Sequence, residues 1–145
     1  MRNGRSLARQ MEKQSNGRSL DKRSSEEVAL IAADAAMDKK AEAPALLDLR
    51  GKSSVADYSL LLSGANDRHV AAITEEIVTR LKRSKVTLLG VEGTDTSQWV
   101  LIDLGDVLVH VFQEDARAFY DLDGLWPDAP RREIPGAPAP APGVW

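Results

Sequence analysis

The segment 99–112, WVLIDLGDVLVHVF, predicts a β-hairpin around which the rest of the fold can be placed. Gly105 and Asp106 occupy the two central positions of a tight turn, where glycine accepts a positive φ and aspartate tolerates the left-handed region. Side chains alternate along a strand, so this register places six aliphatic residues on one face. They are Val100, Ile102, Leu104, Val107, Val109 and Val111. Burial of each is favourable by about 1.5 to 3 kcal/mol, so this face alone can anchor the hairpin in a core.

The opposite face of the predicted hairpin is mixed in character. It carries aromatic side chains at one end and ionisable ones nearer the turn: Trp99, Leu101, Asp103, Leu108, His110 and Phe112. Large apolar groups interleaved with polar ones are typical of a protein interface, where a few aromatic residues supply most of the binding energy. A helix could instead cover this face, as in most parallel α/β sheets. The residues alone leave both interpretations open.

Helix and strand signals precede the hairpin. Ser24 and Glu27 have the spacing of a capping box, and the apolar repeat that follows them predicts a helix that ends before Pro44. The short apolar runs 45–50 and 58–64 are bounded by turn residues and predict strands.

The remaining segments complete an α/β pattern. Asn66 or Asp67 can cap a second helix whose apolar residues repeat at helical spacing, and 86–92 predicts another strand. The amphipathic segment 113–126 predicts one or two helical turns packed by its large apolar residues. These are Phe119, Tyr120, Leu122, Leu125 and Trp126. The order of elements predicts an α/β fold with helices packed on a mixed sheet of about five strands.

Composition divides the chain into three parts. Residues 1–23 predict a flexible basic leader, 24–133 a single domain, and the Pro- and Ala-rich 134–145 a disordered tail. The leader holds seven basic and two acidic side chains, a balance of +5; because the whole chain is at −3, the remainder is at −8. An acidic domain disfavours nucleic acid as its direct partner and suits a basic protein surface, although the charge could simply aid solubility.

The sequence offers little support for catalysis or metal binding. It has no Cys and two His, which removes thiolate nucleophiles and cysteine-based zinc sites. Ser63 followed by Gly64, with Asp103 and Asp106, loosely resembles nucleotidyltransferase elements. Asp106 lies in the turn and points away from Asp103, however, so these carboxylates are not expected to share a magnesium ion. We expect a cytoplasmic protein that is not an enzyme and uses no cofactor.

Five blocks of the expected domain occur in an order and at a spacing that match a known family. They are LDLRGKSSVADYSLLLSG, DRHV, GVEG, WVLIDLGDVLVHVF and RAFYDLDGLW. From about Ser25 to Arg131, the chain resembles the ribosomal silencing factor family, also called Iojap-like proteins. The resemblance implies a nucleotidyltransferase-like topology without catalytic residues. It also implies a translational repressor that binds the large ribosomal subunit through its ribosomal protein fourteen. Such a repressor sterically blocks association with the small subunit and lowers translation in starvation or stationary phase.

The resemblance assigns the mixed hairpin face to partner binding. The family tryptophan that contacts the ribosomal protein corresponds to Trp99, and Leu101 follows on the same face. Phe112 is the third expected apolar anchor. The acidic residues expected to face lysine and arginine of the basic partner are Asp57, Asp103 and Asp106.

Two of these assignments have alternatives. Asp57 and Tyr58 could rim the same surface, or Asp57 could cap a local turn. His110 could be a pH-sensitive contact or a plain hydrogen-bonded histidine beside the interface.

The function has alternatives as well. A large-subunit assembly factor would use the same docking face as a silencing factor. Family members can form homodimers when off the ribosome. The basic leader could make a minor contact with ribosomal RNA or remain a solvated tail.

Overall fold

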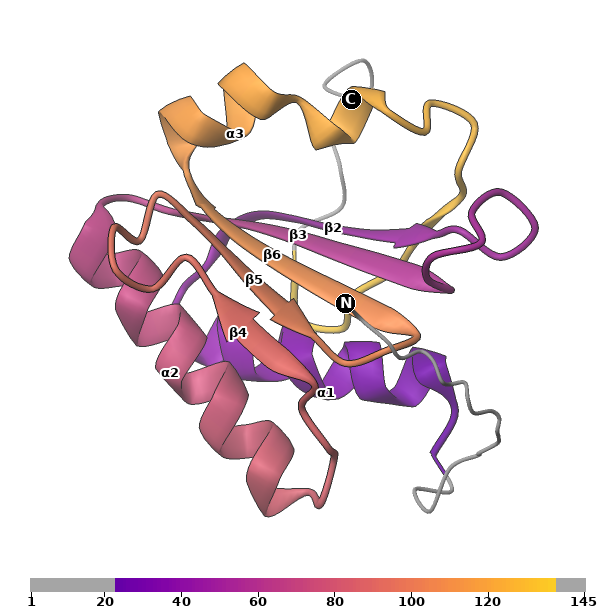
Figure 1. The fold of residues 1–145 in the computed structure, drawn as a ribbon, viewed down its shortest axis with the longest axis horizontal. Coiled ribbons are helices and arrows are strands. Elements are labelled where there is room, and N and C mark those ends of the chain that lie inside the picture. The colour runs from indigo at the N-terminus through magenta and orange to yellow at the C-terminus, as the bar shows by residue number, and fades with distance from the viewer. Residues whose placement is uncertain (1–22, 138–145) are drawn as a thin grey trace.

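A mixed sheet lies between helices in the computed structural model, which describes residues 23–137 (Figure 1). Its elements are α1 (Ser25–Asp38), β2 (Glu42–Asp48), β3 (Tyr58–Gly64), α2 (Asp67–Arg83), β4 (Gly90–Glu92), β5 (Trp99–Asp103), β6 (Val107–Gln113), α3 (Glu114–Tyr120), η1 (Leu122–Gly124) and β7 (Arg131–Arg132). The sheet order is β4-β5-β6-β3-β2-β7; β3 and β6 run parallel and all other neighbours antiparallel. Helices α1 and α2 cover one face and α3 lies on the other. The expected α/β fold with a mixed sheet is confirmed.

The sheet differs from the expectation in strand number and in strand boundaries. In the described part of the chain it has six strands, because the short β7 pairs with β2 at the sheet edge. Of the expected strand 86–92, only β4 forms a strand paired with β5, and it is preceded by a hydrogen bond from the Leu89 amide to the Asp103 carbonyl. Strand β2 begins and ends earlier than the expected strand 45–50 and has an irregular register near its start.

Asp48 explains why β7 joins the sheet. Its carboxylate is 4% exposed and accepts hydrogen bonds from the guanidinium groups of Arg50 and Arg132. The hydrogen bond from Arg50 holds the pKa of Asp48 well below its usual range, against the effect of burial and with further help from Arg132. The ion pair with Arg132 therefore ties β7 to the end of β2.

Strands β5 and β6 pair in the predicted register. Trp99 lies opposite Phe112, and Leu101 lies opposite His110. Gly105 adopts a φ of 90°, which the tight turn requires and which glycine reaches without strain. Five of the six aliphatic residues of the other hairpin face are buried in the main core beneath α1 and α2, and the sixth, Leu104, is partly buried and packs against it.

Both predicted helix starts are confirmed. The amide of Glu27 donates to Ser24 Oγ over 3.1 Å, and the amide of Ser24 donates to Glu27 Oε1 over 2.9 Å. At the start of α2, Asn66 Oδ1 accepts from the amide of His69 over 2.8 Å. These side chains satisfy amides that have no partner within the helix.

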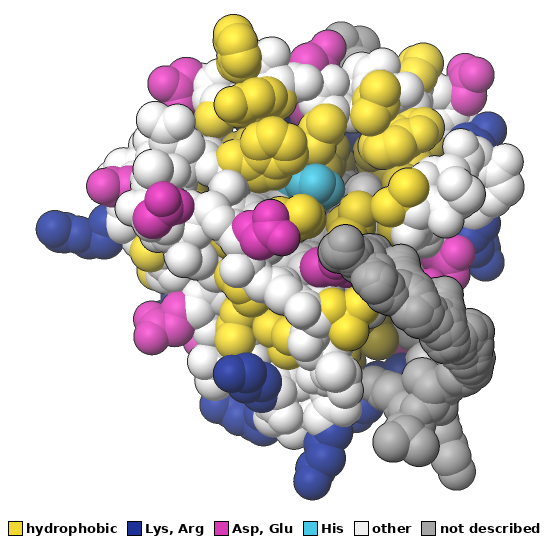
Figure 2. All heavy atoms as spheres, in the orientation of Figure 1, with side chains coloured by type: hydrophobic (Ala, Val, Ile, Leu, Met, Phe, Trp, Pro, Cys, Tyr) yellow, Lys and Arg dark blue, Asp and Glu magenta, His cyan; other side chains and the backbone are white. Residues whose placement is uncertain are grey.

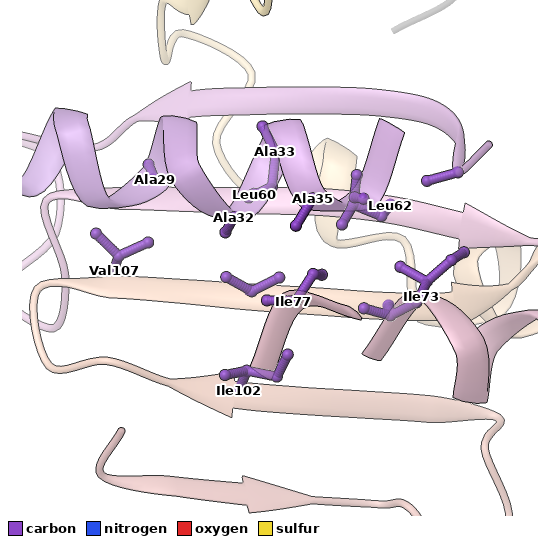
Figure 3. Close-up of a cluster of buried hydrophobic side chains, with 14 of the residues drawn as sticks. Ala29, Ala32, Ala33, Ala35, Leu60, Leu62, Ile73, Ile77, Ile102 and Val107 are labelled. Atoms are coloured by element: carbon purple, nitrogen blue, oxygen red, sulfur yellow. The ribbon is translucent and has the colours of Figure 1, made fainter. Parts of the chain in front are cut away.

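Small and branched side chains pack α1 and α2 onto the sheet. Figure 3 shows alanines of α1 and isoleucines of α2 converging on side chains from β3, β5 and β6. Because alanine ends in a single methyl group, α1 can lie close to the strands. The apolar stripe of α2 is fully buried and consists of Val70, Ile73, Ile77 and Leu81.

The C-terminal boundary of the core lies slightly beyond the expected domain end. Ile134 is 6% exposed and packs into the main core, one residue after the predicted limit of 133. Of the expected leader only Arg23 is described, and of the expected tail only 134–137. Among the described helices, none combines the length and apolar character needed to cross a membrane.

Candidate functional site

Helix α3 and the segment after it cover only part of the second sheet face. There they form a smaller core whose buried members are Ala45, Leu47, Leu49, Leu61, Phe112 and Ala129. Nearer the hairpin turn, Leu101, Asp103 and Leu108 keep part of their surface exposed. A helix therefore covers the part of this face around Phe112, and the part nearer the hairpin turn stays open.

An apolar surface remains exposed where β5 and β6 meet α3. We call it the aromatic patch and define it as Trp99, Leu101, Leu108, Phe119 and Tyr120. Phe119 is 81% exposed, Tyr120 is 49% exposed, and the three strand residues are partly exposed. Figure 2 shows hydrophobic side chains gathered on this face around a histidine, with Asp and Glu side chains at the margin. Exposed aromatic groups bordered by charge are typical of a binding surface.

The prediction that Phe119 and Leu125 pack the C-terminal helix is wrong, because both side chains are mostly exposed. Tyr120 is 49% exposed but does pack against the Trp99 ring. Helix α3 is only seven residues long. Ala116 and Arg117 take its packing side, which turns the bulky residues near its end outward. Two other residues of the same segment, Leu122 and Trp126, do pack against the smaller core.

Trp99 is held in one orientation by contacts on several sides. Its ring stacks on Phe112 with centroids 5.3 Å apart and meets Tyr120 at 4.6 Å. The indole Nε1 donates a hydrogen bond of 3.0 Å to Nδ1 of His110. Gly93, with φ of 89°, approaches so closely that an added Cβ would lie 2.1 Å from the Trp99 carbonyl oxygen. The indole is therefore held in place, and part of its surface stays exposed.

His110 is a neutral, hydrogen-bonded histidine beneath the aromatic patch. It is 7% exposed, and burial lowers its pKa to about 4. The ring therefore does not change charge near pH 7, which supports the plain hydrogen-bonded alternative over the pH-sensitive contact.

Lowering the pH from 7 to 5 is expected to destabilise the fold through His110. The folded-state pKa lies below the ordinary value of 6.5, so the unfolded chain takes up the proton first. The stability contributed by the buried, neutral His110 is fully present above about pH 6.5 and is lost as the pH falls towards 4. The loss amounts to about 2 kcal/mol between pH 7 and 5. Urea unfolding at both pH values should show this extra loss for the wild type relative to His110→Asn, which cannot titrate. An equal pH dependence in the two proteins would contradict it.

Two expected contact residues are buried and cannot touch a partner directly. Phe112 has no exposed surface, because Trp99 and the smaller core cover it. It cannot be the expected apolar anchor and instead supports the Trp99 ring from below. Tyr58 is 1% exposed and packs in the main core on the opposite sheet face, with the Arg50 guanidinium 5.4 Å from its ring centroid. Alternation along β3 places Tyr58 on the side of α1 and α2, away from the aromatic patch.

The three expected acidic contacts lie at the turn end of the hairpin but serve different roles. Asp103 is partly exposed beside the patch, and its Oδ1 accepts from the amide of Gly105 over 2.9 Å. Asp106 is exposed in the turn, and its carbonyl accepts from the amide of Asp57 over 2.8 Å. The Asp57 carboxylate accepts from Ser25 Oγ over 3.0 Å and thereby supports the start of α1. Asp103 borders the patch, and Asp106 lies in the adjoining turn.

Nearly the whole chain matches one protein family. The model of the family described as "Ribosomal silencing factor during starvation" matches residues 22–143. The chain belongs to this family.

Individual members of the ribosomal silencing factor family align over most of this chain. It is 46% identical over 104 residues to the ribosomal silencing factor of Bacillus subtilis, with 72% of this chain and 88% of that protein covered. It is 42% identical over 113 residues to the ribosomal silencing factor of Halalkalibacterium halodurans, with 78% of this chain and 97% of that protein covered. A crystal structure of a Chromobacterium violaceum protein matches with a TM-score of 0.71 at 29% identity, over 79% of this chain and 95% of that chain.

A mitochondrial relative carries a different name. The mouse protein "Mitochondrial assembly of ribosomal large subunit protein 1" is 30% identical over 73 residues, with 48% of this chain and 32% of that protein covered.

In this ribosomal silencing factor family member, Arg117 fastens α3 to the sheet, a role that sequence analysis missed. Its Nε and Nη2 donate to both carboxylate oxygens of Asp123 over 3.0 and 2.9 Å. Its Nη1 donates to Ser63 Oγ over 2.9 Å and to the Ala43 carbonyl over 2.6 Å. Burial raises the pKa of Asp123, but the hydrogen bonds from Arg117 outweigh it and lower the pKa overall. The six-residue spacing between Arg117 and Asp123 indicates that the two could pair, but it does not distinguish a buried ion pair from an exposed one.

Proposed function

We propose that this chain binds the large ribosomal subunit through ribosomal protein fourteen and sterically blocks association with the small subunit. Translation in starvation or stationary phase would fall as a result. The observation that carries this proposal is the exposed aromatic patch, with an oriented Trp99 at its edge, in a member of the ribosomal silencing factor family. A body that excludes a subunit by volume needs affinity and position but no chemistry, so the proposed role is not enzymatic.

The aromatic patch supplies the affinity in this proposal. Tryptophan and tyrosine are enriched among the residues that dominate binding energy at protein interfaces. Trp99 is already stacked and hydrogen bonded, so docking costs little additional side-chain entropy. Leu101 lies two residues along the same strand face and extends the apolar contact. Phe112 acts from below by supporting the indole ring.

Charge supplies the approach and the orientation. Asp103 borders the patch, Asp106 lies in the adjoining turn, and the chain after residue 23 carries a net charge of −8, which suits a basic ribosomal protein. Exposed ion pairs contribute only about 0 to 1 kcal/mol, so these carboxylates would mainly raise the rate of association. The apolar contacts would set the rate of dissociation.

A subunit-joining assay tests the proposed function. Purified large and small subunits are mixed at low magnesium, with and without the protein, and separated on sucrose gradients. We expect fewer joined ribosomes with the wild type, and the protein should sediment with the large subunit. If the protein binds without changing the joined fraction, steric silencing is wrong.

A second candidate function is supported by the mitochondrial relative that is named for assembly of the large ribosomal subunit. An assembly factor would dock with the same aromatic patch on an immature subunit. In the joining assay it would bind without reducing joined ribosomes, and its loss from cells would cause precursor subunits to accumulate.

Two minor partners complete the proposal. A homodimer formed off the ribosome would cover the exposed aromatic groups of the patch. The basic leader could add a contact with ribosomal RNA, but it lies almost entirely outside the described residues. Docking of the patch on the ribosomal protein does not depend on either contact.

A further inference from the structure

The hydrogen bond from Trp99 fixes the position of the proton on His110. An indole Nε1 can only donate, so His110 Nδ1, which accepts this bond over 3.0 Å, carries no proton. A neutral imidazole carries one proton, which must then lie on Nε2. Because burial lowers the pKa of His110 to about 4, the ring is neutral at pH 7 and has this tautomer.

The Nε2–H group opens onto the aromatic patch without a partner of its own. Within residues 23–137, the only hydrogen bond of the His110 ring is the one that Nδ1 accepts. The buried side-chain atoms that lack a partner do not include Nε2. It therefore reaches the surface, although the residue as a whole is 7% exposed. Leu101 lies directly opposite on β5, and the Phe112 ring stacks at 5.9 Å. The Nε2–H group is therefore a hydrogen-bond donor surrounded by apolar side chains.

We propose that His110 Nε2–H donates a hydrogen bond to a neutral carbonyl oxygen of the docked partner protein, an inference that rests on the proposed function of the aromatic patch. A partner that covers the patch removes water from this N–H group, and a buried donor without an acceptor is unfavourable. The bound pose is therefore one that brings an oxygen into line with the Nε2–H bond. A carbonyl suits the position better than a carboxylate, because the apolar surroundings of the ring make an ionised group costly to bury there. His110 in this way determines the specificity of docking.

Two substitutions separate this role from the orientation of Trp99. His110→Asn places an oxygen on Cγ where Nδ1 lies, so it can still accept from Trp99, but it has no atom at the Nε2 position. We expect its affinity for large subunits to fall about tenfold, which corresponds to about 1.4 kcal/mol, with the tryptophan fluorescence maximum unchanged. His110→Gln carries its amide out to the Nε2 position and should recover part of the affinity. Wild-type affinity for His110→Asn would overturn the proposal.

A measurement on the wild-type protein does not depend on how the variants fold. The ¹⁵N chemical shifts of the His110 ring should report an Nε2–H tautomer, and exchange of this proton with water should slow when ribosomal protein fourteen is added. A proton on Nδ1, or exchange that is unchanged in the complex, would overturn the proposal. Trp99→Ala is measured alongside. If it binds like wild type, Trp99 does not dock on the partner and the aromatic patch is not the docking surface. If only it loses affinity while His110→Asn binds normally, the His110 contact alone is wrong.

Discussion

Replacing Trp99 with alanine is expected to weaken binding to purified large subunits about thirtyfold or more, which corresponds to about 2 kcal/mol. The substitution removes the indole of the aromatic patch and also the group against which Tyr120 packs at 4.6 Å. Co-sedimentation at increasing protein concentration measures the affinity. Because the aliphatic hairpin face remains in the main core, we expect the variant to keep its secondary structure, as circular dichroism can show.

Two further variants make this result specific. Leu89→Ala removes an apolar side chain that is 62% exposed but lies outside the aromatic patch, so its binding should match the wild type. Trp99→Phe keeps an aromatic ring and loses the hydrogen bond to His110, so its affinity should lie between wild type and Trp99→Ala. If Trp99→Ala pellets with large subunits as well as wild type does, Trp99 serves only packing within the chain.

Replacing Arg117 with methionine is expected to lower the free energy of unfolding by about 3 to 5 kcal/mol. The guanidinium is 8% exposed, and its loss leaves the Asp123 carboxylate partly buried without its cation. Ser63, which is also buried, and the Ala43 carbonyl lose a donor at the same time. Equilibrium unfolding in urea measures the change. The affected contacts join α3 to β2 and β3, so the aromatic patch should also become more mobile.

Arg80 provides the matched control for this substitution. It pairs with Asp34, Asp38 and Glu76, but its first two partners are largely exposed, so Arg80→Met should lower the free energy of unfolding much less than Arg117→Met does. The double variant Arg117→Met with Asp123→Leu removes the uncompensated charge and should regain part of the stability lost in Arg117→Met. A loss below about 1 kcal/mol for Arg117→Met would show that the buried pair does not hold α3 in place.

Local signals in the sequence predicted much of the fold correctly. The caps at Ser24 and Asn66 are satisfied within three residues, and the hairpin register follows from the turn at Gly105. These features depend on short-range chemistry, which a single sequence displays directly. The short β7 was missed because its pairing depends on a bond between Arg132 and the distant Asp48.

Part of the candidate site could also be predicted, because it depends on the short-range alternation of side chains along a strand. Alternation along β5 placed Trp99 and Leu101 on the face opposite the main core, as observed. Exposure on that face could not be predicted, because it depends on how far α3 reaches across the sheet. Phe112 is sealed and Phe119 is 81% exposed, although both are phenylalanines in apolar segments.

Short-range sequence patterns were enough to predict the helix caps, the hairpin turn and the separation of an aliphatic face from a mixed face, because each depends on residues that are close in the chain. Which part of the mixed face is covered depends instead on how the elements pack together. The bonds from Arg117 to Ser63 and Ala43, residues more than 50 positions away, place α3 over one part and leave the aromatic patch open. Such long-range pairing has no local pattern, since the partners come together only when the sheet has formed.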